Sequence, residues 1–290
     1  MNAGPLITTL IDLDRAIGQP GFKFILGGGF GLYLKQIHLQ QTSVRTVLRG
    51  DLWPSPRATE DLDFFLPTEI VASLEEMTRL RQALDRIEFK PVEAAKFLHF
   101  SKPWEPAGRV KIDMLTGPIG PIIKSKLKGT PPRIRPRGKL QLHAYLTEEA
   151  LAFEESLLAI TLDGVGSDKR PGAVTVHIPQ PFTFLLMKLH AFADRLRDEP
   201  LDPENIYRSR DHSLDVYRIV AMLTEPEFNQ VRQMVHEHST SRPLARAREI
   251  ICEHFSSRTA MGLIRLREHA LFTPRMDAAV LAKNLNELFA

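Results

Sequence analysis

The feature that most constrains the fold is a glycine-rich turn followed by acidic strands. The segment FILGGGF (24–30) predicts a short apolar strand that ends in three glycines. Downstream, RATEDLDFFL predicts a strand with Asp61 and Asp63 one residue apart, and RVKIDML predicts a strand with Asp113 at its middle. Together these segments predict a mixed α/β unit with acidic side chains on its sheet.

The chain is expected to divide at about residue 180. Residues 1–180 alternate short apolar runs with helical patterns, which predicts a mixed α/β domain. Residues 181–290 keep helical spacing, with breaks at prolines, which predicts a helical domain that contributes to the cleft of the site. The predicted fold class is therefore α+β: a mixed β-sheet flanked by helices, followed by a C-terminal helical domain.

Periodicity predicts the following elements. Helices are expected over 6–17, 30–38 and 68–87, the last with Thr68 as N-cap, and strands over 22–26, 61–66, 97–100, 109–115, 140–145, 157–162 and 173–178. Residues 116–139 contain seven basic residues, no acid and several prolines. This segment is either a solvated basic loop or a surface for RNA phosphates. It contains no aromatic residue, so its sequence does not indicate base stacking.

Bulk properties exclude several classes of protein. The net charge of +3 is too weak by itself to indicate a nucleic-acid partner. Cys252 is the single cysteine, so no intramolecular disulfide can form, which is typical of a reducing compartment. The first residues include Asp12 and Asp14 and do not resemble a signal peptide. No apolar run approaches the ~20 residues of a membrane helix. We expect a cytoplasmic protein with no membrane association.

The acidic strands predict a metal site. Side chains alternate along a strand, so Asp61 and Asp63 share one face, and Asp113 lies on the face opposite Ile112. If the two strands are neighbours, the three carboxylates converge on one polar face, and a divalent cation would relieve their repulsion. Oxygen ligands favour Mg²⁺ or Mn²⁺. A lone Asp-x-Asp pair at a strand start is more often structural, and the third acidic strand strengthens the prediction.

The glycine turn at 27–29 has two interpretations. It is either a tight turn with close packing of helix on strand, or a cradle whose backbone N–H groups bind the triphosphate of a nucleotide. The turn lacks the lysine of a Walker motif and the spacing of a dinucleotide fingerprint, which argues against a P-loop NTPase and a Rossmann dehydrogenase.

These residues resemble the nucleotidyltransferase superfamily of the DNA polymerase β type. Within it the chain is most similar to AbiEii-type nucleotidyltransferases of bacterial abortive-infection and toxin–antitoxin systems. The resemblance includes the paired glycines, the pattern Arg57-x-Thr59-x-Asp61-x-Asp63, the later Asp113, and two helical motifs, FTFLLMKLHAFADR and RSRDHSLDVYRIV. These motifs span about the first two thirds of the chain.

The resemblance implies an activity and a set of site residues. The activity is Mg²⁺-dependent transfer of an NMP from an NTP to a hydroxyl acceptor, an RNA such as a tRNA 3′ end, in a toxin whose implied partner is a cognate antitoxin. The implied nucleotide-binding residues are Gly27, Gly28, Gly29, Arg57, Thr59 and Lys188. The implied metal ligands are Asp61, Asp63 and Asp113, and the implied catalytic residues are these three with Lys188 and Asp211.

Other interpretations stay open. The acceptor could be a small molecule such as an antibiotic, or a protein side chain. The chain could also be a non-catalytic nucleotide-binding interaction module, because Gly29 stands where the family commonly has Ser or Thr. Asp211 could simply form a salt bridge with Lys188 or Arg195. His99 and His190 are most simply packing residues.

Overall fold

The computed structural model describes residues 3–18, 22–42, 44–57, 59–95, 97–104 and 108–290. They form two compact units: residues 1–34 with 57–179, and residues 35–56 with 180–290. One mixed sheet and about eleven helices confirm a mixed α/β fold consistent with the α+β class. The second unit includes residues 35–56, and its longer part begins at Gln180, with the first helix of that part at Pro181.

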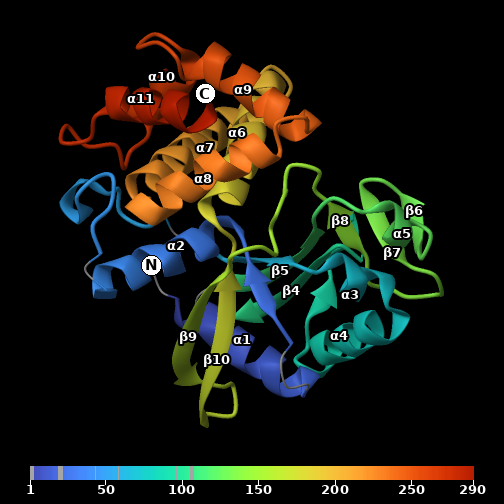
Figure 1. The fold of residues 1–290 in the computed structure, drawn as a ribbon. Helices are drawn as coiled ribbons and strands as arrows, with labels where there is room; N and C mark the ends of the chain where they lie inside the picture. Colours follow the sequence, from blue (N-terminus) through green and yellow to red (C-terminus); the bar gives the residue numbers. More distant parts are fainter. Residues whose placement is uncertain (1–2, 19–21, 43, 58, 96, 105–107) are drawn as a thin grey trace. The chain divides into compact units, whose positions relative to one another are not determined.

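The first unit contains all the described strands (Figure 1). They are β1 (Phe24–Leu26), β2 (Asp61–Phe65), β3 (Lys90–Pro91), β4 (His99–Trp104), β5 (Gly108–Thr116), β6 (Leu127–Thr130), β7 (Arg133–Pro136), β8 (Ala144–Leu146), β9 (Leu158–Val165) and β10 (Pro171–Ile178). Its helices are α1 (Gly4–Ile17), α3 (Thr68–Ala72), α4 (Leu74–Arg86), α5 (Pro121–Lys124) and a 3₁₀ turn (Glu93–Ala95), and α2 (Gly28–Thr42) begins there and continues into the second unit.

These strands form one sheet. Its main order is β6-β7-β8-β5-β2-β1-β10-β9, and β4 pairs with both β5 and β3. β2 and β8 are parallel to β5, β1 is parallel to β10, and the remaining pairs are antiparallel. β4 and β8 pair with successive parts of β5, at residues 108–113 and 115–116. A strand at the middle of the sheet therefore has three partners.

One face of the sheet is apolar and covered by helices. Leu62 on β2 and Ile112 on β5 are fully buried on this face. The Arg81 guanidinium of α4 lies over the Phe100 ring, which is in register with Ile112, so α4 covers this side. Figure 1 shows α1 behind β9 and β10, where Ile11 approaches the strand glycines. The burial of these side chains fixes the register, because a shift by one residue would expose them.

Two predictions about local structure in this unit need correction. The helix expected over 68–87 is two helices, α3 and α4, and Thr68 is the first residue of α3 and not an N-cap. The chain leaves helical geometry at Ser73, whose hydroxyl accepts the backbone N–H of Glu76 and so caps α4. The basic segment 116–139 is not a loop throughout, because it contains a short helix, α5, and an antiparallel hairpin, β6 and β7. Its alternative role as a surface for RNA phosphates stays a prediction.

The second unit is helical. It contains α6 (Pro181–Asp198), α7 (Glu204–Ala221), α8 (Glu225–Glu237), α9 (Arg242–His254), α10 (Met261–Glu268), α11 (Ala278–Phe289) and a 3₁₀ turn (Gly50–Leu52). Residues 46–48 pair with the link between α7 and α8: the N–H of Val47 donates to the carbonyl of Leu223 at 2.8 Å. Among the described residues, no helix has the length and apolar character to cross a membrane.

Candidate functional site

The three predicted aspartates lie on one face of two neighbouring strands. β2 and β5 pair in parallel, with Asp63 opposite Asp113 and Asp61 opposite Lys111. These residues are partly exposed, while Leu62 and Ile112 between them are buried. The condition set by the sequence analysis, that the two acidic strands are neighbours, is therefore met in the first unit.

Each end of this acidic row has a cationic partner. The Lys111 ammonium lies 3.3 Å from an oxygen of Asp61. On β4, His99 is in register with Asp113, and its Nδ1–H donates a short hydrogen bond to Oδ1 of that carboxylate. This hydrogen bond raises the pKa of His99; partial burial opposes the rise, and the negative charges of Asp113, Asp63 and Asp61 add to it. His99 therefore lies on the same face as the three aspartates and pairs with the last of them.

The glycine turn lies directly against the acidic row. The N–H of Gly27 donates to the carbonyl of Asp63 at 2.9 Å, and α2 begins at the next residue. Gly28 has a φ of +58°, and a Cβ atom there would lie 1.7 Å from Oδ2 of Asp63. Only glycine allows this approach. The N-terminus of α2, a favourable place for an anion, thus adjoins the Asp63 carboxylate.

Thr59 lies beside the third glycine of the turn. A Cβ at Gly29 would meet the side chain of Thr59 at 3.6 Å and its hydroxyl oxygen at 3.7 Å, which are ordinary van der Waals contacts. The same hydroxyl accepts the N–H of Asp61 at 3.2 Å. A hydroxyl group is therefore present next to Gly29. Arg57, also predicted to bind nucleotide, is partly exposed ahead of β2.

The acidic row suits a hard cation that takes few protein ligands. Among the described residues, no group of three or more His, Cys, Asp or Glu side chains is gathered closely enough to hold a metal ion by itself. Asp113 pairs with His99, and Asp61 pairs with Lys111, so two of the three carboxylates already have a basic partner. Mg²⁺ commonly binds through one or two carboxylates, with waters and substrate phosphates as its other ligands. The carboxylates fit that mode of binding.

Lys188 and Asp211, the other predicted catalytic residues, belong to the second unit. Lys188 on α6 is buried, and its ammonium lies 2.8 Å from Oδ2 of Asp215 on α7. Its partner is therefore the aspartate one helical turn beyond Asp211. Asp211 itself is 3.1 Å from Nε2 of His269. The predicted contact of Lys188 with a triphosphate stays a prediction.

The Lys188–Asp215 pair is part of a buried polar network. Arg218, which is 1% exposed, lies 3.3 Å from the second oxygen of Asp215. It also donates to Oε1 of Gln36 at 3.0 Å, and the Gln36 amide donates to the carbonyl of Pro54 at 3.2 Å. The network ties residues 35–56 to α6 and α7. A carboxylate between two buried cations offsets much of the cost of burying them.

Sequence reasoning missed three of these participants. His99 was interpreted as a packing residue, because FLHF shows no sign of a partner fourteen residues away. Lys111 was visible only as an alternating residue of its strand. Gln36 has no motif at all. Alternation did predict that Lys111 would lie on the face opposite Ile112, but not which residue it would meet.

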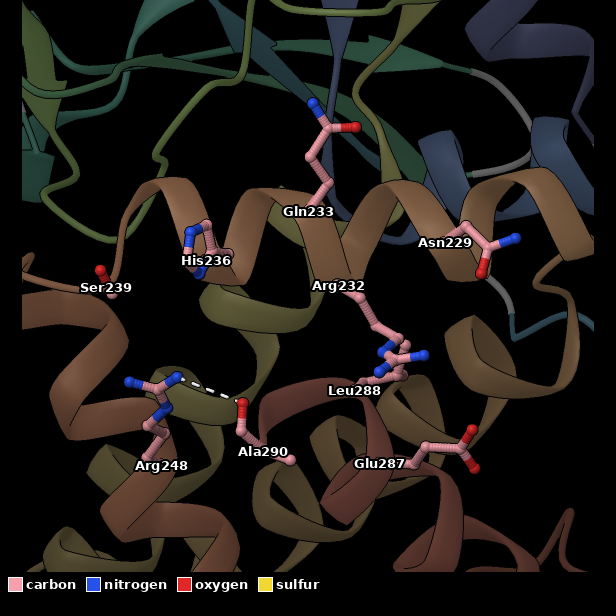
Figure 2. Close-up of a pocket in the computed structure, with 9 residues that line it drawn as sticks. All are labelled: Asn229, Arg232, Gln233, His236, Ser239, Arg248, Glu287, Leu288 and Ala290. Carbon is pink, nitrogen blue, oxygen red and sulfur yellow. Dashed lines mark hydrogen bonds between the residues drawn. The ribbon is translucent and has the colours of Figure 1, made fainter.

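A separate pocket of about 540 Å³ lies in the second unit between α8, α9 and α11 (Figure 2). Its lining includes Arg232, His236 and Glu287, and Figure 2 shows Arg248 hydrogen-bonded to Ala290. None of the predicted site residues lines this pocket.

Comparison with models of protein families, with curated protein sequences and with solved structures gives no match to this chain.

Proposed function

We propose that this protein is a nucleotidyltransferase whose first unit binds an NTP and transfers its NMP to a hydroxyl group, with an RNA end as acceptor. The observation that supports this most is the contact of Gly28 with Asp63. It brings the N–H groups of a helix N-terminus, which suit phosphate, beside a carboxylate that suits the phosphate's cation.

In the proposed reaction the acceptor oxygen attacks the α-phosphorus of the NTP. A new phosphorus–oxygen ester bond forms, the bond from the α-phosphorus to the bridging oxygen of pyrophosphate breaks, and pyrophosphate leaves. Asp113 accepts the hydroxyl proton. The chain contributes mainly by positioning, since phosphoryl-group transfer depends largely on alignment and charge neutralisation.

Asp61 and Asp63 are the residues proposed to hold Mg²⁺ or Mn²⁺, together with the phosphates, and Asp113 is proposed as the base alone. When bound, the cation neutralises charge on the phosphates and the leaving group. Gly28 and Gly29 present backbone N–H groups to the phosphates, and Thr59 presents its hydroxyl beside them.

The biological role follows from the resemblance alone and is part of the proposal. AbiEii-type relatives suggest a toxin that modifies RNA, such as the 3′ end of a tRNA, and an antitoxin protein as its partner. No feature of the described residues favours an antibiotic or a protein acceptor over RNA. The labelling experiment described next distinguishes these three kinds of acceptor.

The test is incubation of the purified protein with Mg²⁺ and each α-labelled NTP, with total bacterial tRNA, with a panel of hydroxyl-bearing small molecules, and with neither. We expect label on RNA. The Asp63→Asn variant should reduce transfer by at least about 100-fold, as losses of groups that stabilise a transition-state charge do.

Asp163→Asn is the matched control. Asp163 is an exposed aspartate of β9 without an ion pair among the described residues, and its replacement should leave transfer unchanged. Transfer that persists in Asp63→Asn would disprove the proposed chemistry. Nucleotide binding without release of pyrophosphate under every condition would identify a binding module instead of an enzyme.

A further inference from the structure

The basic hairpin and the acidic row lie on the same face of the sheet. Asp113 and Leu115 are two residues apart on β5 and so point to one side. Leu115 is in register with Tyr145 on β8, and Tyr145 is in register with Arg133 on β7. Residues directly opposite each other on paired strands share a face. A continuous row therefore extends from Leu115 through Tyr145 to Arg133.

Burial supports this assignment of faces. Tyr145 is 43% exposed, while its neighbours Ala144 and Leu146 are buried. On β7, Arg133 is exposed while Ile134, in register with Ala144, is buried. The side of the sheet that carries Tyr145 and Arg133 is therefore open to solvent within the first unit.

Further cations extend the row to the edge of the sheet. Arg133 is in register with Thr130 on β6, and Arg135 is in register with Lys128, so these residues share the face. Arg135 bends back to donate to the carbonyl of Gly138. In the part of the chain that the structure describes, Lys128 and Arg133 form no ion pair, and both are exposed. Their charges are available to an anion.

Strand geometry sets the scale of this surface. With strands ~4.8 Å apart and a rise of ~3.3 Å per residue, Tyr145 lies roughly 8 Å from Asp113, and Arg133 is one strand further away. The last few nucleotides of an acceptor strand could reach from Arg133 to the acidic row. An exposed aromatic ring beside cations is the combination that single-stranded nucleic acids bind, by base stacking and phosphate contact.

We propose that Tyr145, Arg133 and Lys128 form the binding surface for the single-stranded 3′ end of an RNA acceptor, a proposal that rests on the transferase function above. Tyr145 stacks on a base, and the two cations contact phosphates. The two cations would attract an acidic protein as well as RNA, but the exposed tyrosine ring favours nucleic acid, whose bases can stack on it. The hairpin then leads the RNA end toward Asp113.

Binding can be measured without any turnover. The probe is a fluorescently labelled single-stranded RNA of roughly ten nucleotides, and its anisotropy reports affinity in the absence of nucleotide. Tyr145→Ala should weaken binding by about tenfold, and Tyr145→Phe should keep most of it, because the ring is what stacks. Tyr207→Ala, at an exposed tyrosine of α7, is the matched control and should have no effect.

The cations are tested by their salt dependence. Replacing Arg133 and Lys128 by Gln should reduce the slope of log affinity against log salt concentration by about 0.7 for each lost phosphate contact. Lys90→Gln, at an exposed lysine of β3, should leave the slope unchanged. A slope that stays the same in the double variant would overturn the assignment of these residues.

The outcomes separate this inference from the proposed function. RNA binding that depends on Tyr145, in a protein with no transferase activity, would support the surface and reject the enzyme. Transfer to RNA that is insensitive to Tyr145→Ala would support the enzyme and reject the surface. A wild-type protein that binds a polyglutamate peptide but not the RNA would show a protein-binding surface and overturn the inference.

Discussion

At the scale of single residues, Gly28 is the glycine of the turn with the least room for a side chain, because Asp63 lies against it. We expect Gly28→Ala to destabilise the first unit by about 1–3 kcal/mol, because the new methyl group would overlap the carboxylate and the φ of +58° disfavours alanine. Urea unfolding reports this through Trp104 on β4 in a Trp53→Phe background, since the chain has only these two tryptophans.

Gly29→Ala is the control for this substitution. Its methyl group would make only ordinary contacts with Thr59, so we expect a change of less than about 1 kcal/mol. Equal losses of stability in the two variants would show that the turn as a whole, and not the approach to Asp63, requires glycine.

His99 should give the stability of the metal-free protein a distinctive pH dependence. The pKa of His99 is raised above 6.5, chiefly by its hydrogen bond to Asp113. The stability that protonated His99 contributes is therefore fully present below pH 6.5 and is lost as the pH rises through its raised pKa. The difference in unfolding free energy between wild type and His99→Gln should shrink over that range, measured with EDTA present.

His177 should behave in the opposite way. Burial, helped by the charge of Lys23, lowers the pKa of His177, so the native state resists its protonation. Stability is then lost as the pH falls through the unfolded pKa of 6.5 toward the lowered native value. His177→Gln should remove that loss. A change of the same sign for both variants would contradict the two assignments.

At the scale of elements, the junction of α6 and α7 depends on Asp215 more than on Asp211. Asp215→Ala would leave buried Lys188 and Arg218 without the carboxylate between them, which we expect to cost about 3–5 kcal/mol. Asp211→Ala should cost about 1 kcal/mol or less, since its pair with His269 is partly exposed. Trp53 fluorescence in a Trp104→Phe background reports the second unit. Similar losses of unfolding free energy in the two variants would show that burial of the ion pair does not decide how much each aspartate contributes.

Element prediction from the sequence succeeded where periodicity was long and failed where it was short. The helical character of residues 181–290 was predicted without bounds for single helices, and the strand expected over 61–66 is observed over 61–65. The hairpin β6–β7 was missed, because each strand has four residues, too few for a clear alternation of apolar and polar residues. The break at Ser73 was missed, because apolar spacing continues across it.

At the scale of the whole molecule, nucleotide binding should stabilise the unit that contains the acidic row. A ligand that binds only the native state at 100 times its dissociation constant adds about 2.7 kcal/mol. We expect Mg²⁺ with an NTP to raise the unfolding midpoint reported by Trp104, and Asp63→Asn to abolish the shift. A shift that persists in Asp63→Asn, or that occurs only in the Trp53 signal, would place the nucleotide elsewhere.

The sequence alone determined which side chains share a face. Alternation is a property of the local backbone, so the common face of Asp61 and Asp63, and of Asp113 with Lys111, follows from their spacing. The glycine turn after an apolar strand is equally local. These features were sufficient to nominate the acidic residues of the candidate site.

The tertiary structure alone decided which side chains meet. His99 reaches Asp113, and Tyr145 lies beside Arg133, because strands distant in sequence pair in a particular order and register. The pairing of Lys188 with Asp215 instead of Asp211 likewise depends on how α6 packs on α7. Register and helix packing are set by burial of apolar faces over the whole unit, and no local pattern encodes them.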